Sequence, residues 1–176
     1  MTGGAGAARR LVLLRHARAE QGGRDVDELR PLALEGRRQS TRVSAALVEH
    51  GLVPDLVLCS SAVRTRQTWE LVRNGLGGAK PEAVVTDALY EAGPGDVLAQ
   101  VREVDPGVRT LLVVGHEPTV STLAALLAGP GSDDAGVARV RAGISTASFV
   151  VLEVDVDWSG LDRAGAVLRA VVSPKD

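Results

Sequence analysis

The sequence has little cysteine, few aromatic residues and almost no lysine. Cys59 is the single cysteine among 176 residues, which excludes an intrachain disulfide and a zinc site built on several thiolates. The aromatic residues are two tryptophans, one tyrosine and one phenylalanine, so the core must consist mainly of valine, leucine and alanine. Of the 20 basic residues, only Lys80 and Lys175 are lysine. Positive charge is therefore supplied by arginine, whose planar fork matches phosphate oxygens.

Long apolar runs and a strong net charge are also absent. No apolar stretch approaches the roughly 18 residues of a membrane-spanning helix, and the first ten residues, MTGGAGAARR, lack the apolar segment of a signal peptide. The formal net charge of −2 gives no bulk electrostatic basis for binding nucleic acid. These absences predict a cytoplasmic protein with no membrane or nucleic-acid partner. They leave its oligomeric state open, with a monomer as the default.

Short apolar runs alternate with helical periodicity along most of the chain. The predicted strands are residues 11–14, 56–59, 84–85, 111–114, 148–154 and 166–172, and the predicted helices are 35–50, 62–74, 97–104 and 118–128. Gly51 is expected just beyond the first helix, and Ser60 and Ser61 are candidate caps of the second. The alternation predicts an α/β fold, a three-layer sandwich with a mostly parallel central sheet flanked by helices on both faces.

The length fits one domain. We expect a flexible N-terminal tail over residues 1–8 and a single domain over 9–176. The polar stretch from Gly22 to Leu32, which includes Asp25 and Asp27, is predicted to be a loop.

Two predicted strands end in the same way. LVLLRH (11–16) and LLVVGH (111–116) each have four apolar residues, one intervening position and a histidine. Open parallel sheets bind ligands beyond the carboxyl ends of their strands, so His16 and His116 are expected at the same edge. Arg15 lies beside the first histidine, and Arg64 lies in the first turn of the helix that follows residues 56–59. Three strand ends thus bring two histidines and two arginines together.

This set of side chains suits phosphate chemistry. Guanidinium forks bind a phosphate dianion, a neutral imidazole can attack phosphorus, and a protonated second histidine can stabilise charge on the phosphoryl oxygens. Each histidine taken alone could instead be structural, and a pair could bind a metal, but the neighbouring arginines would repel the cation. The residues therefore predict a site that needs no metal and no cofactor.

The same residues resemble the motifs of the histidine phosphatase superfamily, which includes phosphoglycerate mutases and many phosphatases. The motif pieces are Arg15-His16-Ala17, Ser60-Ser61-x-x-Arg64-x-x-x-Thr68 and Gly115-His116-Glu117-Pro118. The resemblance covers most of the chain, and the three pieces in this order are far more specific than any one alone. It implies that His16 is the phosphorylated nucleophile and that Arg15, Arg64 and His116 form the phosphate pocket.

Within the superfamily, the sequence is most similar to SixA-type phosphohistidine phosphatases. The chain is short, and Arg30-Pro31-Leu32 leads through Glu35-Gly36 into the first helix. Ala17 departs from the glycine most common in the superfamily and agrees with this branch. The resemblance implies a metal-independent phosphatase acting on phosphohistidine protein. A small-molecule phosphomonoesterase and a non-catalytic phosphate-binding module are the alternatives, and a short chain with an open pocket disfavours a mutase.

The segment after the third strand decides whether the site has a general acid. An alkoxide leaving group needs protonation, which is worth roughly 10²–10⁴-fold in rate, whereas imidazole leaves with little help. Much of the superfamily has an acidic residue in this segment, and SixA-type members are described as lacking it. Here Glu91 is the candidate, either as a general acid or as a solvated loop carboxylate. Tyr90, beside it, is expected to pack at the pocket rim.

Overall fold

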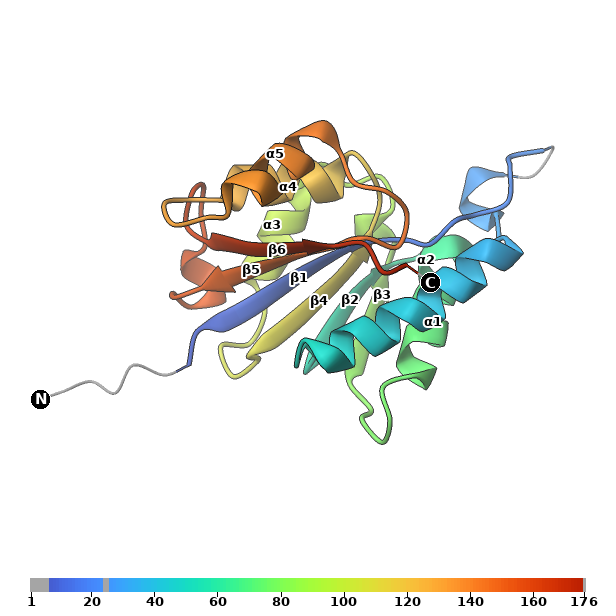
Figure 1. Cartoon of the computed structure of the whole chain (residues 1–176), viewed down its shortest axis with the longest axis horizontal. Coiled ribbons are helices and arrows are strands. Elements are labelled where there is room, and N and C mark those ends of the chain that lie inside the picture. Colours follow the sequence, from blue (N-terminus) through green and yellow to red (C-terminus); the bar gives the residue numbers. More distant parts are fainter. Residues whose placement is uncertain (1–6, 24–25, 176) are drawn as a thin grey trace, which may run out of the picture.

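The strands of the computed structural model, which describes residues 7–23 and 26–175, form one mostly parallel sheet (Figure 1). The strands are β1 (Arg9–Arg15), β2 (Leu56–Ser60), β3 (Glu82–Thr86), β4 (Thr110–Gly115), β5 (Phe149–Val154) and β6 (Val167–Val172). Their order is β3-β2-β4-β1-β5-β6. The first four strands pair in parallel, and β5 runs antiparallel to both β1 and β6. The predicted sheet is confirmed.

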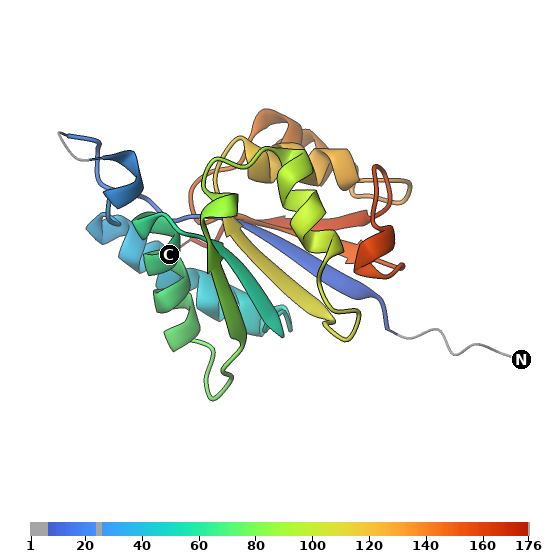
Figure 2. The same cartoon turned by 180° about the vertical axis from the view of Figure 1, so that it is seen from behind.

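Helices cover both faces of this sheet (Figures 1 and 2). The helices are α1 (Leu34–Glu49), α2 (Val63–Asn74), α3 (Pro94–Arg102), α4 (Thr119–Leu127) and α5 (Asp134–Ala142), with short 3-10 turns η1 (Asp27–Leu29), η2 (Asp87–Leu89) and η3 (Trp158–Gly160). Because side chains alternate along a strand, Leu11 and Leu13 pack in the core under α3 and α4, whereas Val12 and Leu14 pack in the core under α1 and α2. The three-layer architecture is confirmed.

Several local predictions differ from the structure. Ser60 and Ser61 do not cap α2, because Ser60 is the last residue of β2 and the cap position is occupied by Ala62, with no side-chain cap bond. Pro118 precedes the first helical residue of α4 as its cap residue. Helix α5 was not predicted. Gly51 follows α1 with a φ of 65°, as expected for a glycine at that position.

Part of the predicted N-terminal tail and two residues of the predicted loop cannot be compared with the structure. Residues 1–6 of the tail, together with Arg24 and Asp25, lie outside the described residues. In the described part of the chain, no helix is long and apolar enough to cross a membrane.

The site lies where the chain connections diverge. After β1 the chain leaves through α1 on one face of the sheet, whereas after β4 it leaves through α4 on the other face. Strands β1 and β4 are neighbours, with Arg15 paired to Gly115 at their carboxyl ends. Such a switch point opens a crevice beyond the strand ends in an open α/β sheet. His16 and His116 are the residues that immediately follow these two strands.

Gly36 fixes the segment that follows His16. A Cβ atom at this position would overlap the backbone carbonyl of Arg18, and the same carbonyl accepts a hydrogen bond from the backbone N–H of Ala33 at 2.9 Å. The backbone N–H of Arg18 donates to Oε1 of Gln39 at 2.9 Å. Close packing of α1 on this segment therefore requires glycine at position 36.

Gly36→Ala should lower stability and activity together. The overlap is with backbone, which cannot rotate away, so we expect a loss of about 1–3 kcal/mol in the free energy of unfolding. Urea unfolding measures this loss, and Gly95→Ala in α3 is the matched control. A Cβ at Gly95 would meet nothing within 4 Å, so this substitution should stabilise the helix slightly. Equal effects of both substitutions would contradict the close packing at Gly36.

Candidate active site

The two histidines predicted from the strand ends lie side by side. The backbone N–H of His16 donates to the carbonyl of Gly115 at 3.0 Å, and the ring centroids of His16 and His116 are 5.3 Å apart. The backbone of the first loop is fixed from α2, because the N–H of Ala17 donates to Oγ1 of Thr68 at 3.0 Å. Strands β1 and β4 and helix α2 therefore set the position of the pair.

The contacts of His16 define which ring nitrogen is free. Its Nδ1 lies 2.7 Å from the carbonyl oxygen of Ala17, and a carbonyl can only accept, so Nδ1 holds the proton. Its Nε2 accepts a hydrogen bond from Nε–H of Arg64 at 3.3 Å. A neutral imidazole has one protonated nitrogen and one lone pair. The lone pair of His16 thus lies on Nε2 and points to Arg64.

His116 has the opposite arrangement. Its Nδ1 accepts from a terminal nitrogen (Nη2) of Arg64 at 3.4 Å, and its Nε2 lies 2.7 Å from Oγ of Ser60. Because arginine only donates, the proton of the neutral ring lies on Nε2, and Ser60 accepts it. The serine expected to cap α2 instead orients the second histidine. Both lone pairs of the histidine pair therefore face the same guanidinium.

Burial and positive charge keep both rings neutral. His16 is 9% exposed, and burial, with smaller contributions from His116, Arg64 and Arg15, lowers its pKa to about 3 despite the opposing hydrogen bond to Ala17. Burial and then the charge of Arg64 lower the pKa of His116 to about 4. At neutral pH the site therefore presents two uncharged imidazoles.

Arg64 uses two edges of its guanidinium in different ways. The edge formed by Nε and Nη2 faces the two histidines, as described above. At the other edge, Nη1 donates to the backbone carbonyl of Asp27 at 2.9 Å, and Nη2 donates to its Oδ2 at 3.1 Å. The side chain of Arg64 is 8% exposed. These acceptors replace the water that burial removes from the guanidinium.

Arg15 is anchored by a residue whose contribution the sequence analysis missed. Its terminal nitrogen Nη1 donates to the carbonyl of Ile144 at 2.8 Å, and within the described chain its buried Nε–H has no hydrogen-bond partner. The backbone N–H of Ile144 in turn donates to Oε2 of Glu117 at 3.3 Å. Glu117 also accepts from the backbone N–H and the hydroxyl of Ser121 at 2.8 and 2.7 Å. It therefore links the start of α4 to the loop that holds Arg15.

The functional side chains open onto a polar cleft of about 340 Å³. The residues that line it are Arg15, His16, Arg18, Ala19, Gln21, Arg30, Arg64, His116, Glu117 and Thr146. Its charged groups are four arginines and one glutamate, so the cleft attracts anions. All four residues predicted to form a phosphate site contribute to this one cleft.

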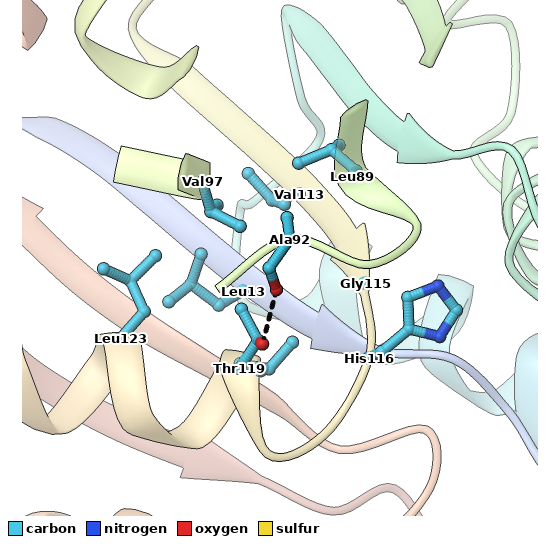
Figure 3. Close-up of a pocket in the computed structure, with 10 residues that line it drawn as sticks. Leu13, Leu89, Ala92, Val97, Val113, Gly115, His116, Thr119 and Leu123 are labelled. Atoms are coloured by element: carbon cyan, nitrogen blue, oxygen red, sulfur yellow. Dashed lines mark hydrogen bonds between the residues drawn. The ribbon is translucent and has the colours of Figure 1, made fainter. Parts of the chain in front are cut away.

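A second cavity lies against His116 and is apolar (Figure 3). It has a volume of about 20 Å³, and leucine and valine side chains form most of its wall. The hydroxyl of Thr119 donates to the carbonyl of Ala92 across it at 2.7 Å. A space of this size holds about one water molecule, so it is too small for a substrate group. The hydrogen bond instead fixes the segment after η2 to the start of α4.

Glu91 lies in this segment and is exposed. It is not among the residues that line the polar cleft. Tyr90, beside it, has its ring edge against His116 with centroids 5.8 Å apart, and its hydroxyl donates to Oδ2 of Asp27 at 2.6 Å. The tyrosine thus lies at the rim of the site, as expected, whereas Glu91 has no contact with the cleft.

The residues that the structure describes include no group of three or more His, Cys, Asp and Glu side chains that could hold a metal ion. The histidine pair is instead surrounded by guanidinium groups.

Comparisons with known proteins agree with this geometry. A family model described as histidine phosphatase superfamily (branch 1) matches residues 11–106. The chain is 38% identical over 163 residues to the uncharacterized protein Rv1276c of Mycobacterium tuberculosis, covering 92% of this chain and 100% of that protein.

Two solved structures are similar over nearly the whole chain. A candidate phosphohistidine phosphatase SixA from Nakamurella multipartitia has a TM-score of 0.85 and 33% identity, covering 97% of this chain and 98% of its own. The protein histidine phosphatase SixA complexed with tungstate has a TM-score of 0.76 and 25% identity, covering 94% and 97%.

The chain belongs to the histidine phosphatase superfamily, since the matching family model spans more than half of it. Within that superfamily it is SixA-like, and it is a phosphatase.

The depressed histidine pKa values predict how stability depends on pH. In the unfolded chain both histidines have a pKa of about 6.5, so between that value and their folded values of about 3 and about 4 the unfolded state binds more protons. The free energy of unfolding should therefore fall as the pH is lowered from about 6.5 to about 4.5. His16→Gln and His116→Gln should each make this dependence shallower. Urea unfolding at several pH values measures it, and equal slopes in all three proteins would contradict the burial of neutral rings.

Proposed function

We propose that the protein hydrolyses phosphohistidine in proteins through a phosphorylated His16. Nε2 of His16 attacks phosphorus and forms an N–P bond, while the bond from phosphorus to the leaving group breaks and the leaving atom takes its electron pair. Nδ1–H stays donated to Ala17 as the ring becomes cationic. Water then attacks phosphorus, the N–P bond breaks, and Nε2 regains its lone pair. Inorganic phosphate leaves, and one proton of the water passes to solvent.

The shared orientation of two histidines toward Arg64 is the observation that supports this proposal most directly. The Nε and Nη2 donors of Arg64 now satisfy ring nitrogens at 3.3 and 3.4 Å. A phosphoryl group would accept these donors and release Nε2 of His16 for attack. The Nε–H of Arg15, which has no hydrogen-bond partner among the described residues, offers a further donor. A bound dianion would also raise the pKa of His116, so that the protonated ring can stabilise phosphoryl oxygens.

The leaving group and the similar structures both support the proposed substrate class. An imidazole leaves as a neutral ring when its second nitrogen holds a proton, so it needs no general acid, unlike an alkoxide. Glu91, the candidate acid, is exposed and does not line the cleft. The names of the similar structures also refer to phosphohistidine phosphatases. A phosphorylated protein is therefore our proposed partner.

We also propose that the reaction needs no metal, because the arginines of the cleft supply the positive charge that a cation would otherwise provide. We further propose that the protein is monomeric and cytoplasmic, with a single domain over residues 9–176.

Trapping the phosphorylated enzyme tests this mechanism. With radiolabelled phosphohistidine peptide and EDTA present, rapid quenching in alkali should give a base-stable, acid-labile adduct that mass spectrometry locates at His16. His16→Ala should abolish adduct and turnover. His50→Ala is the matched control, because Nδ1 of His50 also lies against a backbone carbonyl, 2.8 Å from that of Ala46, and His50 does not line the cleft. Turnover at the wild-type rate in His16→Ala would exclude the mechanism, and activity lost in EDTA but restored by one divalent metal would exclude metal independence.

Glu91→Gln separates the proposed substrate class from small phosphomonoesters. If the carboxylate stays outside the cleft, the variant should match the wild type on alkyl phosphates, nitrophenyl phosphate and phosphohistidine peptide alike. A general acid would instead give a loss within the roughly 10²–10⁴-fold range on alkyl phosphates alone, because only their leaving groups need protonation. Steady-state kinetics on the three substrates decide this. A selective loss on alkyl phosphates would favour the phosphomonoesterase.

A further inference from the structure

Asp27 is outside the motifs of the sequence, yet its side chain joins several segments at the cleft. Oδ1 accepts from Nε of Arg30 at 3.0 Å, and Oδ2 accepts from the Tyr90 hydroxyl at 2.6 Å and from Arg64 at 3.1 Å. Arg30 also donates to the backbone carbonyl of Glu20 at 2.9 Å. One carboxylate therefore ties together η1, the loop after β1, helix α2 and the turn after η2.

We infer that Asp27 is a positioning residue that holds the guanidinium of Arg64 in the orientation needed to bind the phosphoryl group. The inference rests on the proposed function, which assigns the Nε and Nη2 donors of Arg64 to that group. Asp27 contacts the adjacent edge, through its carbonyl on Nη1 and its carboxylate on Nη2, and Nη2 is shared by both edges. An arginine side chain has many rotamers, and a small misplacement of a binding group costs much of the rate. Asp27 can therefore hold the guanidinium in place while the hydrogens of Nε and Nη2 that face the histidines stay available to the phosphoryl group.

The segment that contains Asp27 is itself anchored to the helix of Arg64. The backbone N–H of Leu32 donates to Oε1 of Gln67 at 2.8 Å, and Gln67 is one helical turn beyond Arg64 on α2. Within η1, the backbone N–H of Arg30 donates to the carbonyl of Asp27 at 3.1 Å. The segment that contains Asp27 is thus hydrogen-bonded to the same helix that contains Arg64.

A carboxylate near an anion site could instead compete with the substrate. The geometry argues against competition, because Asp27 contacts Nη1 and Nη2 of Arg64 whereas the histidines contact Nε and Nη2, and the shared Nη2 has one hydrogen for each edge. Its charge is also shared with Arg30, and the Tyr90 hydroxyl, with Arg30 and Arg64, keeps the pKa of Asp27 well below its usual range. The carboxylate therefore stays ionised and bonded to these donors at any pH at which the enzyme works. If Asp27 positions Arg64, removing its charge should lower kcat, whereas if it competes with the substrate, removing its charge should leave kcat unchanged or raise it.

Asp27→Asn tests the clamp by kinetics. We expect kcat to fall by at least about tenfold and KM to stay equal or fall, because a negative charge near an anion has been removed. Tyr90→Phe, which leaves the carboxylate on Arg64 but deletes one of its donors, should lose less. Asp162→Asn is the matched control. Asp162 is also exposed and also accepts from an arginine, Arg102, at 3.1 Å, and it does not line the cleft. A kcat that is unchanged or higher in Asp27→Asn, with tighter binding of tungstate by calorimetry, would make Asp27 a competitor and overturn the inference.

NMR of the arginine Nε–H groups tests the clamp without turnover. The Arg64 signal, assigned by its loss in Arg64→Lys, should exchange slowly with solvent in the wild type and in Asp162→Asn. In Asp27→Asn it should exchange at least about tenfold faster, as expected for a side chain that visits other rotamers. An unchanged exchange rate would overturn the inference even if activity falls. A wild type that turns over no phosphorylated substrate would refute the proposed function, and the exchange rates would still decide whether Asp27 fixes Arg64.

Discussion

Burying a guanidinium is costly unless most of its N–H groups find acceptors, and the candidate active site is arranged around Arg64, whose side chain is 8% exposed. Two acceptors are the neutral histidines at the ends of β1 and β4, and the others belong to Asp27. The hydroxyl of Thr68, which donates to the Arg64 carbonyl at 2.7 Å, also accepts from the backbone of the loop after β1. The hydrogen bonds made by the side chain and the carbonyl of Arg64 therefore connect two strands, one helix and the η1 segment.

The strands and the histidine pair could be predicted because their signals are local. An apolar run such as residues 11–14 identifies a buried strand, and a parallel sheet places the residues after such strands at one edge. The order β2-β4-β1 makes these strand ends neighbours. No long-range contact had to be known to expect His16, Arg64 and His116 in one place. Their roles as nucleophile and phosphate ligands remain predictions.

The supporting residues could not be predicted because their signals are not local. Asp27 reads as a loop carboxylate until the fold places it on Arg64, and Ser60 reads as a helix cap until β4 brings His116 to 2.7 Å. Helix α5 has a glycine, Gly136, in its first turn, and glycine is a poor helix former. The structure explains this glycine, since a Cβ there would lie 2.6 Å from the side chain of Leu168 in β6. Asp133, whose carboxylate caps α5 at the N–H of Gly136, is the one local feature of the sequence that indicates the start of this helix. Glu117 lies inside a recognised motif, but its support of the loop that holds Arg15 is visible only from its hydrogen bond with Ile144.

The burial of His16 also suits its proposed role as a nucleophile, because the ring must first bond to phosphorus and later be displaced from it by water. A low pKa makes Nε2 of His16 a weaker base, but the lone pair is then present on nearly every molecule at neutral pH and needs no proton removed before attack. In the second step of the proposed cycle the same low basicity helps, because the ring must give up phosphorus to water. In the proposed mechanism the guanidinium groups assist attack instead, because they offset the charge of the phosphoryl oxygens. Under this proposal, desolvation of one imidazole favours breakdown of the intermediate, and the arginines favour its formation.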